Sequence, residues 1–267
     1  MIKSKLSSRK RYLQISLNNT IDEARKIILQ LPISDRILIE AGTPLIKRYG
    51  EEGIREIKQW YKQHILAQTL KSTEPSIGKD SLSWSFLKTA IKNYYPSKMY
   101  QEQSLNSETV PYVVADLKMM DRAETEVEIA ARAGADAAIA LGYAPIESLN
   151  AFIQKCEELG LDAMIDMMNV EYPLSILRQL KKLPQVVILH RGVDEEKFNK
   201  EKQIPLHEIR RIKGNYNILI AIAGGDTLKE VQRAIFNNAD IVIVWKSFFQ
   251  STSDTAKLAE EFLKEIK

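Results

Sequence analysis

Short apolar runs alternate with longer segments of helical periodicity along most of the chain. The apolar runs fall at 12–17, 36–41, 111–118, 135–142, 161–168, 185–190, 217–225 and 240–245. Near-continuous apolar runs are typical of parallel strands that are buried on both faces. Eight strand–helix pairs filling the chain predict an α/β fold, a (β/α)₈ TIM barrel, rather than the alternative of an open doubly wound sheet.

Residues at the ends of the helical segments support this reading. Thr20 and Glu23 have capping-box spacing after the first strand. Gly160 ends the segment after the fourth strand as a C-cap glycine. The segment after the second strand is helical but is expected to break near Gly50 and Gly53.

One polar stretch, residues 65–109, interrupts the alternation just before the third strand. It predicts an insertion within a single barrel domain, 1–267, in which residues 81–95 form an amphipathic helix. Its aromatic residues are Trp84, Phe86, Tyr94 and Tyr95. Because the insertion precedes a strand, it emerges on the N-terminal side of the barrel, which favours an interface or packing role over a lid.

Composition narrows the class of protein. The 267 residues are 45% hydrophobic and 27% charged, with a net charge of +3, which fits a globular protein and gives little indication of nucleic-acid binding. No apolar run approaches the roughly 20 residues that span a bilayer. A single cysteine, Cys156, excludes an internal disulfide and suits the cytoplasm. The basic residues 1–11 are expected to be a frayed terminus, and His64 and His207 to be solvated.

Candidate chemistry comes from the C-terminal ends of the strands, where barrel enzymes carry their catalytic groups. These ends hold Asn18, Glu40, Asp116 with Lys118 and Asp121, Asp166, His190, and Gly224 with Gly225. Each carboxylate alone could be a helix cap, but caps have no reason to converge on one mouth. The set therefore predicts an active site there.

The strongest constellation is the sequence D-L-K-M-M-D at 116–121. Asp116 and Lys118 lie two apart on a strand and should face the same way. Carboxylates keep such a lysine protonated, ready to stabilise a developing enolate or to deliver a proton. Glu40, at the neighbouring strand end, could share Mg²⁺ with Asp116.

These motifs resemble the orotidine monophosphate decarboxylase suprafamily, and most closely its 3-hexulose-6-phosphate synthase branch. The matching segments are I-E-A-G-T-P-L-I (39–46), D-L-K-M-M-D (116–121), E-x-E-x-A-x-x-A-G-A-D (126–136), H-R-G-V-D (190–194), I-A-G-G (222–225) and A-D-I-V-I-V (239–244). The resemblance implies an aldol-type lyase that joins formaldehyde to ribulose 5-phosphate through a Mg²⁺-stabilised enediolate. It also implies a homodimer.

The resemblance carries residue roles with it. Glu40 and Asp116 would hold Mg²⁺, Lys118 would stabilise the enediolate, and His190 would transfer a proton. Asp121 would reach into the partner's site. Substrate contacts are expected from Asn18, Asp166, Arg191, Gly224, Gly225 and Lys246.

Three positions depart from the family pattern. Asn18 stands where an aspartate is usual, Asp226 follows the A-G-G motif, and Trp245 replaces a glycine in the loop that would hold a phosphate. Two alternatives therefore stay open. One is a related decarboxylase (a carboxy-lyase) or isomerase acting on another substrate. The other is a non-catalytic barrel that serves as a binding or scaffold protein.

Overall fold

The computed structural model describes residues 4–72, 109–250 and 254–267, which form a closed parallel barrel. The strands are β1 (Tyr12–Leu17), β2 (Ile37–Ala41), β3 (Val113–Met119), β4 (Ala137–Leu141), β5 (Asp162–Asp166), β6 (Val186–His190), β7 (Leu219–Ala223) and β8 (Ile241–Val244). Each strand pairs in parallel with the next, and β1 pairs with β8 to close the ring. The prediction of a (β/α)₈ barrel is confirmed.

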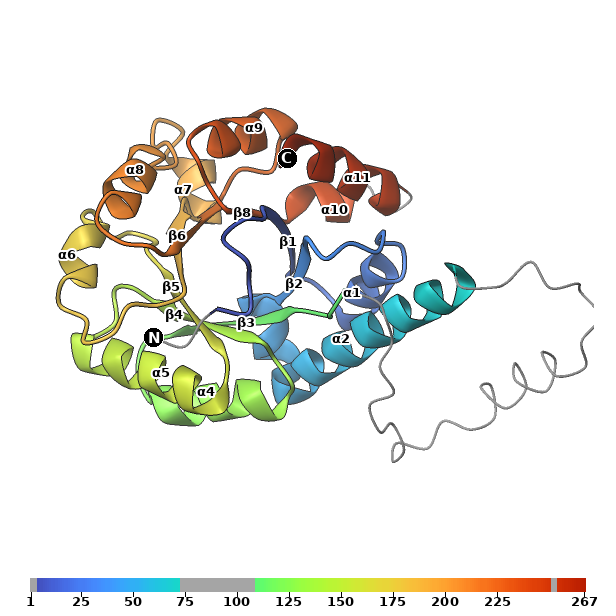
Figure 1. Cartoon of the computed structure of the whole chain (residues 1–267), viewed down its shortest axis with the longest axis horizontal. Coiled ribbons are helices and arrows are strands. Elements are labelled where there is room, and N and C mark those ends of the chain that lie inside the picture. Colours follow the sequence, from blue (N-terminus) through green and yellow to red (C-terminus); the bar gives the residue numbers. More distant parts are fainter. Residues whose placement is uncertain (1–3, 73–108, 251–253) are drawn as a thin grey trace, which may run out of the picture.

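Helices surround the ring of strands (Figure 1). They are α1 (Ile21–Ile28), α2 (Thr43–Ser72), α4 (Ala123–Arg132), α5 (Ile146–Leu159), α6 (Pro173–Leu177), α7 (Val193–Phe198), α8 (His207–Lys213), α9 (Leu228–Phe236), α10 (Lys246–Gln250) and α11 (Thr255–Glu265). The predicted capping box of Thr20 and Glu23 is present at the start of α1. Helix α2 continues to Ser72, and the predicted insertion otherwise lies outside the described residues, as do its aromatic side chains. Within the described residues, no helix is long and apolar enough to cross a bilayer.

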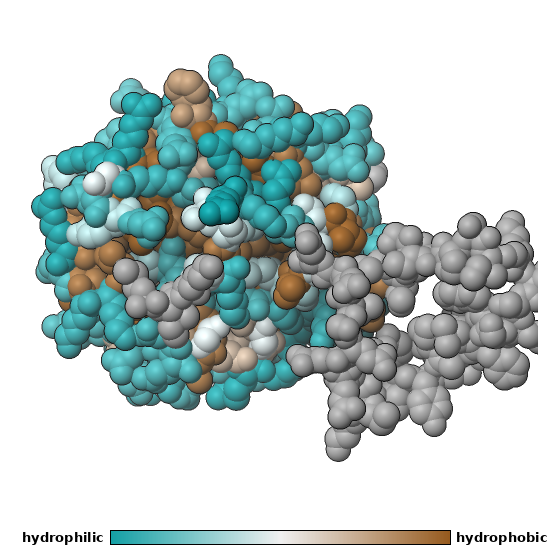
Figure 2. All heavy atoms as spheres, in the orientation of Figure 1, coloured by the Kyte–Doolittle hydropathy of each residue, from teal (hydrophilic) through white to brown (hydrophobic). Residues whose placement is uncertain are grey.

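Alternation along the strands divides the core into two layers. On β1, Leu13, Ile15 and Leu17 face outward and pack with the helices. Tyr12 belongs to the separate cluster that fills the barrel interior. This split explains why nearly every strand position is buried. On the face shown in Figure 2, hydrophilic residues cover most of the surface and apolar atoms appear between them.

The N-terminal segment closes one end of the barrel, so the expectation of a frayed terminus is wrong for residues 4–11. Leu6 is 7% exposed and belongs to the interior cluster. The Ser4 hydroxyl and the Lys5 amide donate to the carboxylate of Asp162, and so does the Tyr112 hydroxyl. The buried carboxylate of Asp162, at the start of β5, thus holds the N-terminal segment in place. The basic residues of this segment gave no sign of that contact in the sequence.

His64 is also not solvated as expected. It is 5% exposed on α2, and its Nε2 lies 2.8 Å from the carbonyl oxygen of Leu31. This hydrogen bond to a buried carbonyl offsets the cost of burying the ring nitrogen. The side chain of His207 is 72% exposed, as expected.

Candidate active site

A pocket of about 660 Å³ opens at the C-terminal ends of the strands. Most of the residues singled out from the sequence line it: Asn18, Glu40, Asp116, Lys118, Asp166, His190, Arg191, Gly224 and Lys246. A cavity of this size is typical of a small-molecule site. The structure therefore brings the predicted strand ends together at one mouth.

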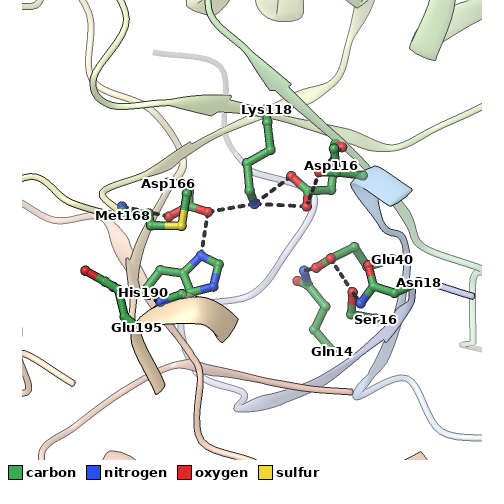
Figure 3. A network of polar contacts seen from close by, with 12 residues as sticks. Gln14, Ser16, Asn18, Glu40, Asp116, Lys118, Asp166, Met168, His190 and Glu195 are labelled. Carbon is green, nitrogen blue, oxygen red and sulfur yellow. Dashed lines mark hydrogen bonds and ion pairs between the residues drawn. The ribbon is translucent and has the colours of Figure 1, made fainter. Parts of the chain in front are cut away.

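Lys118 lies at the centre of a charged network that joins three strands (Figure 3). Its Nζ donates to both carboxylate oxygens of Asp116, at 3.0 and 2.9 Å, and to Oδ2 of Asp166 at 2.8 Å. The same Asp166 oxygen lies 2.7 Å from Nδ1 of His190. The backbone N–H of Met168 donates to the other Asp166 oxygen at 2.9 Å.

This network sets the charge of each member. Burial would raise the pKa of Asp166, but His190 and Lys118 outweigh it and hold that pKa well below its usual range. Burial would lower the pKa of Lys118, but Asp116 and Asp166 raise it overall. Burial opposes the charge of His190 too, and Asp166 again raises its pKa above the usual value. The site therefore holds an ammonium group beside carboxylates, with an imidazole that takes up a proton readily.

Lys118 reaches this position through an irregular end of β3. Its φ is 49°, in the left-handed region that side chains rarely adopt. The register between β3 and β4 shifts between Ala115 and Met119. Such backbone outliers often occur at functional sites, where the surrounding contacts maintain them.

A second polar cluster surrounds Glu40 inside the barrel. Gln14 Nε2 and Ser16 Oγ donate to the two carboxylate oxygens of Glu40, and Asn18 Nδ2 donates to Ser16 Oγ at 3.0 Å. Gln14 is fully buried and Ser16 nearly so. Sequence reasoning missed Gln14 and Ser16, although the polar positions of Q-I-S-L-N in an apolar strand are a readable signal.

Thr43 at the start of α2 is a further residue that was missed. Its Oγ1 lies 2.8 Å from Oδ2 of Asp116 and 2.9 Å from the Asp116 carbonyl oxygen. Gly42 before it leaves room for the Asn18 side chain, since a Cβ there would lie 2.0 Å from Oδ1 of Asn18. The A-G-T segment (41–43), which follows β2, thus fixes the carboxylate of Asp116 by a hydrogen bond from Thr43.

The carboxylates of Glu40 and Asp116 fit a hard divalent cation. They lie on paired strands, and both residues are 5% exposed. Burial and the charge of Asp116 raise the pKa of Glu40 to about 7, a cost that a cation between the two carboxylates would relieve. No group of three or more His, Cys, Asp or Glu side chains suited to a metal occurs among the described residues. Two carboxylates are nevertheless a common donor set for Mg²⁺, which keeps several water or substrate ligands.

The C-terminal ends of β6 and β7 form another wall of the pocket, and Arg191 links the two ends. Its Nη2 donates to the carbonyl oxygen of Gly224 at 2.8 Å and lies 3.4 Å from Glu230. Gly224 has φ of 91°, and a Cβ there would lie 2.2 Å from the Arg191 carbonyl oxygen. Nη2 of Arg191 is thus engaged with the protein itself, whereas its Nε is buried with no hydrogen-bond partner among the described residues.

The carboxylate of Asp226 accepts hydrogen bonds from the backbone N–H groups that follow β8. Its Oδ1 accepts from the N–H of Trp245 at 2.5 Å and from that of Lys246 at 3.1 Å. Burial raises the pKa of Asp226, and these two hydrogen bonds partly offset the rise. The Nζ of Lys246 pairs with Glu196.

Asp121 and Gly225 do not line the pocket of the described residues. Asp121 is exposed in the turn between β3 and α4. At Gly225, a Cβ would lie 3.0 Å from the Cβ of Glu230 on α9, so this glycine serves close packing.

Comparison with known proteins agrees with this architecture. Residues 84–262 match the model of the orotidine 5'-phosphate decarboxylase / HUMPS family. The chain is 30% identical over 257 residues to the bifunctional enzyme Fae/Hps of Methanothrix thermoacetophila, covering 96% of this chain and 53% of that protein. The chain thus spans about half the length of the curated relatives it matches.

Solved structures share the fold at lower identity. The 3-hexulose-6-phosphate synthase of Salmonella typhimurium superposes with a TM-score of 0.71 and 22% identity, covering 96% of this chain and 98% of that chain. The KGPDC of Streptococcus mutans gives a TM-score of 0.66 at 14% identity, covering 96% of this chain and 97% of that chain. These likenesses support the barrel fold.

Proposed function

Because the chain belongs to the orotidine 5'-phosphate decarboxylase / HUMPS family, we propose that it is an aldol-type carbon–carbon lyase of the 3-hexulose-6-phosphate synthase kind. The observation that carries the proposal is the Lys118 ammonium, which two carboxylates hold at the pocket mouth. A fixed cation of this kind stabilises the negative oxygen of an enediolate as it forms. The proposed substrates are ribulose 5-phosphate and formaldehyde.

The reaction needs one proton to leave a carbon and one to reach an oxygen. In the proposed mechanism, neutral His190 donates Nδ1–H to Asp166 and uses Nε2 to take the proton from C1 of the ketose. The electron pair of the broken C–H bond forms the enediolate, whose oxygens Lys118 stabilises. The enediolate carbon attacks formaldehyde, and the His190 imidazolium returns its proton to the new alkoxide. The raised pKa of His190 favours this uptake and return.

Glu40 and Asp116 would hold Mg²⁺, which supplies Lewis-acid polarisation of the ketose carbonyl when bound. Gln14 and Ser16 orient Glu40, and Thr43 orients Asp116. These hydrogen bonds keep both carboxylates directed into the pocket, with little reorganisation left for the reaction itself.

The proposed assembly is a cytoplasmic homodimer in which Asp121 enters the partner's pocket. Its support is the exposure of Asp121 at the rim of the barrel mouth, next to Met120, which is 43% exposed. An exposed carboxylate outside the pocket of its own chain is placed where it can enter the pocket of a second copy.

A related decarboxylase is the second candidate function. The His190-Arg191-Gly192 sequence at the end of β6 also resembles the keto-gulonate-phosphate decarboxylase branch of the same family. Such an enzyme would use the same enediolate stabilisation. The two candidates differ in the bond that breaks, so the assay separates them.

The test is the assay of the purified protein with Mg²⁺, ribulose 5-phosphate and formaldehyde, following the loss of formaldehyde. We expect turnover that disappears in Asp116→Ala and persists in Asp194→Ala, a carboxylate of the pocket wall outside the network. Absence of turnover at every Mg²⁺ concentration would refute the synthase. Release of CO₂ from a 3-keto sugar acid phosphate would then support the decarboxylase.

A further inference from the structure

Helix α7 lies at the mouth of the pocket without being packed into the barrel. Val193, Asp194 and Glu196 line the pocket, yet no residue of α7 is buried. Val193 is 48% exposed and Phe198 77%. Elements with few buried apolar contacts open at a low cost in free energy. The position of α7 therefore depends on its polar contacts.

Two of these polar contacts differ in what they join. Glu195 accepts from the N–H of Gly192 at 3.0 Å and pairs with Lys202, so these contacts stay within the segment between β6 and α8. Glu196 pairs instead with Lys246, which follows β8. Because β7 lies between β6 and β8 in the ring, this ion pair ties α7 to the other side of the rim.

Two donors on the same rim have no partner within the chain. Nε of Arg191 and Nε1 of Trp245 are buried, and neither has a hydrogen bond to any residue that the structure describes. Both residues line the pocket, and Arg191 is only 9% exposed. A buried donor without an acceptor costs free energy, which an acceptor on a ligand would remove. The rim beside Lys246 is therefore suited to an anionic group, at the place where (β/α)₈ barrels commonly bind phosphate.

The carboxylate of Glu196 already occupies the ammonium group that such an anion would use. The side chains of Glu196 and Lys246 are 34% and 30% exposed, and an ion pair this accessible to water is weak. A phosphate monoester carries about two negative charges near neutral pH and can replace the single charge of Glu196. An uncharged sugar cannot do so.

We propose that Glu196 is a specificity-determining residue, which occupies Lys246 and holds α7 at the mouth until a substrate that ends in a phosphate monoester displaces it. The phosphate then pairs with Lys246, and repulsion between like charges releases Glu196 and α7. An uncharged sugar leaves the ion pair intact. This inference rests on the proposed function only in taking the substrate to end in a phosphate.

The first experiment is calorimetric titration of the full chain with ribulose 5-phosphate, inorganic phosphate and ribulose, in the presence of Mg²⁺ and without formaldehyde. Glu196→Gln frees Lys246, so it should bind the two phosphates about three- to fivefold more tightly and ribulose unchanged. Asp194→Asn is the matched control, because it removes the same charge from the same helix and the same pocket wall. Asp194 has no ion pair within the described parts of the chain, so this variant should keep all three affinities. Equal tightening in both variants would overturn the proposal.

A double-mutant cycle with Lys246→Met separates the ion pair from the charge of Glu196 alone. In the Lys246→Met background no ammonium group remains to be released, so Glu196→Gln should no longer tighten the binding of phosphate. A gain that persists in this background would show that Glu196 does not act through Lys246.

Hydrogen exchange of the amides of residues 193–198, followed by mass spectrometry, tests the release of α7. Inorganic phosphate should speed this exchange in the wild type. Glu196→Gln should exchange about three- to fivefold faster already without ligand, because the same ion pair is missing, and Asp194→Asn should exchange like the wild type. Slower exchange in the presence of phosphate, or wild-type exchange in Glu196→Gln, would overturn the release of α7.

These outcomes are separate from the failure of the proposed function, because none of the measurements needs formaldehyde. Tighter phosphate binding and faster exchange in Glu196→Gln without turnover of formaldehyde would refute only the function. Turnover of formaldehyde with wild-type phosphate affinity in Glu196→Gln would refute only the role of Glu196.

Discussion

At the scale of single residues, Lys118 decides whether two buried carboxylates can coexist in the pocket. Asp166 is 1% exposed and Asp116 5%, and both rely on the same ammonium. Burying a charge without a partner is costly, so the three groups form one unit. The same ammonium is the group proposed to stabilise the enediolate.

Replacement of Lys118 by methionine should separate its role as counter-ion of the carboxylates from its role in stabilising the enediolate. We expect Lys118→Met to lower kcat roughly 100- to 1000-fold and to destabilise the protein by about 3 kcal/mol, because Asp116 loses its counter-ion and Asp166 keeps only His190. Lys213→Met is the matched control, since Lys213 and Asp240 form a similarly exposed pair away from the pocket. It should cost stability but keep kcat, as measured by thermal unfolding and the formaldehyde assay. Equal loss of kcat in both variants would point to a general effect of destabilisation.

The hydrogen bonds to Glu40 lead to a prediction about metal affinity. Ser16→Ala removes a donor to Glu40 and the acceptor for Asn18. Loss of a partner that orients a metal ligand usually weakens binding about 10- to 100-fold. Calorimetric titration with Mg²⁺ should show a loss in this range, while Ser175→Ala, on the exposed surface of α6, should leave affinity unchanged. Unchanged affinity in Ser16→Ala would show that Glu40 needs no such support.

The sequence predicted the polar residues at the ends of the apolar strands, but not the residues that orient these side chains by hydrogen bonds. Glu40, Asp116, Asp166 and His190 each follow an apolar run, where a charged or polar residue is conspicuous. Ser16 supports Glu40 only because the β1–β2 register sets the two side by side. Registers between strands depend on the closed barrel and cannot be read from one strand.

At the scale of secondary-structure elements, periodicity predicted the strands well and their irregularities poorly. The run 111–118 was expected to be a strand, and the structure gives Val113–Met119 with a register shift and a left-handed Lys118. Alternation alone would place Asp116 and Lys118 on one face, but the reach of Lys118 to Asp166 depends on that irregular backbone. By contrast, the break in α2 could be predicted, because a glycine, Gly50, marks it in the sequence.

The break at Gly50 should be more sensitive to substitution than an ordinary helix end. With φ of 60° and ψ of −146°, Gly50 occupies a region almost restricted to glycine, and Gly50→Ala should cost roughly 2–3 kcal/mol. Gly160→Ala is the matched comparison, because Gly160 has φ of 71° and ψ of 31°, a left-handed conformation that costs roughly 1 kcal/mol. A Cβ meets nothing within 4 Å at either position, so only the backbone differs. Urea unfolding that ranked Gly160→Ala as the more destabilising would contradict this account.

At the scale of the whole molecule, the two ends of the barrel have separate tasks. Leu6 and its neighbours close the N-terminal end around Asp162, whereas the C-terminal end carries the pocket. This division follows the general rule for the fold, in which chemistry lies at the C-terminal ends of the strands. Only Asp121, among the charged residues predicted for the site, lies outside the pocket of its own chain, as far as the described residues define that pocket.

The position of Asp121 outside its own pocket leads, with the proposed homodimer, to a prediction about mixed dimers. If Asp121 acts in the partner's pocket, Asp121→Ala and Lys118→Met should each be inactive as homodimers, because every site lacks one group. Mixing the two variants after unfolding and refolding should give half mixed dimers, each with one complete site, and so about a quarter of wild-type turnover. The formaldehyde assay measures the recovery, and native mass spectrometry confirms that mixed dimers form. Mixed dimers that stay as inactive as their parents would place Asp121 outside the partner's site and leave its exposed carboxylate to a role within its own chain.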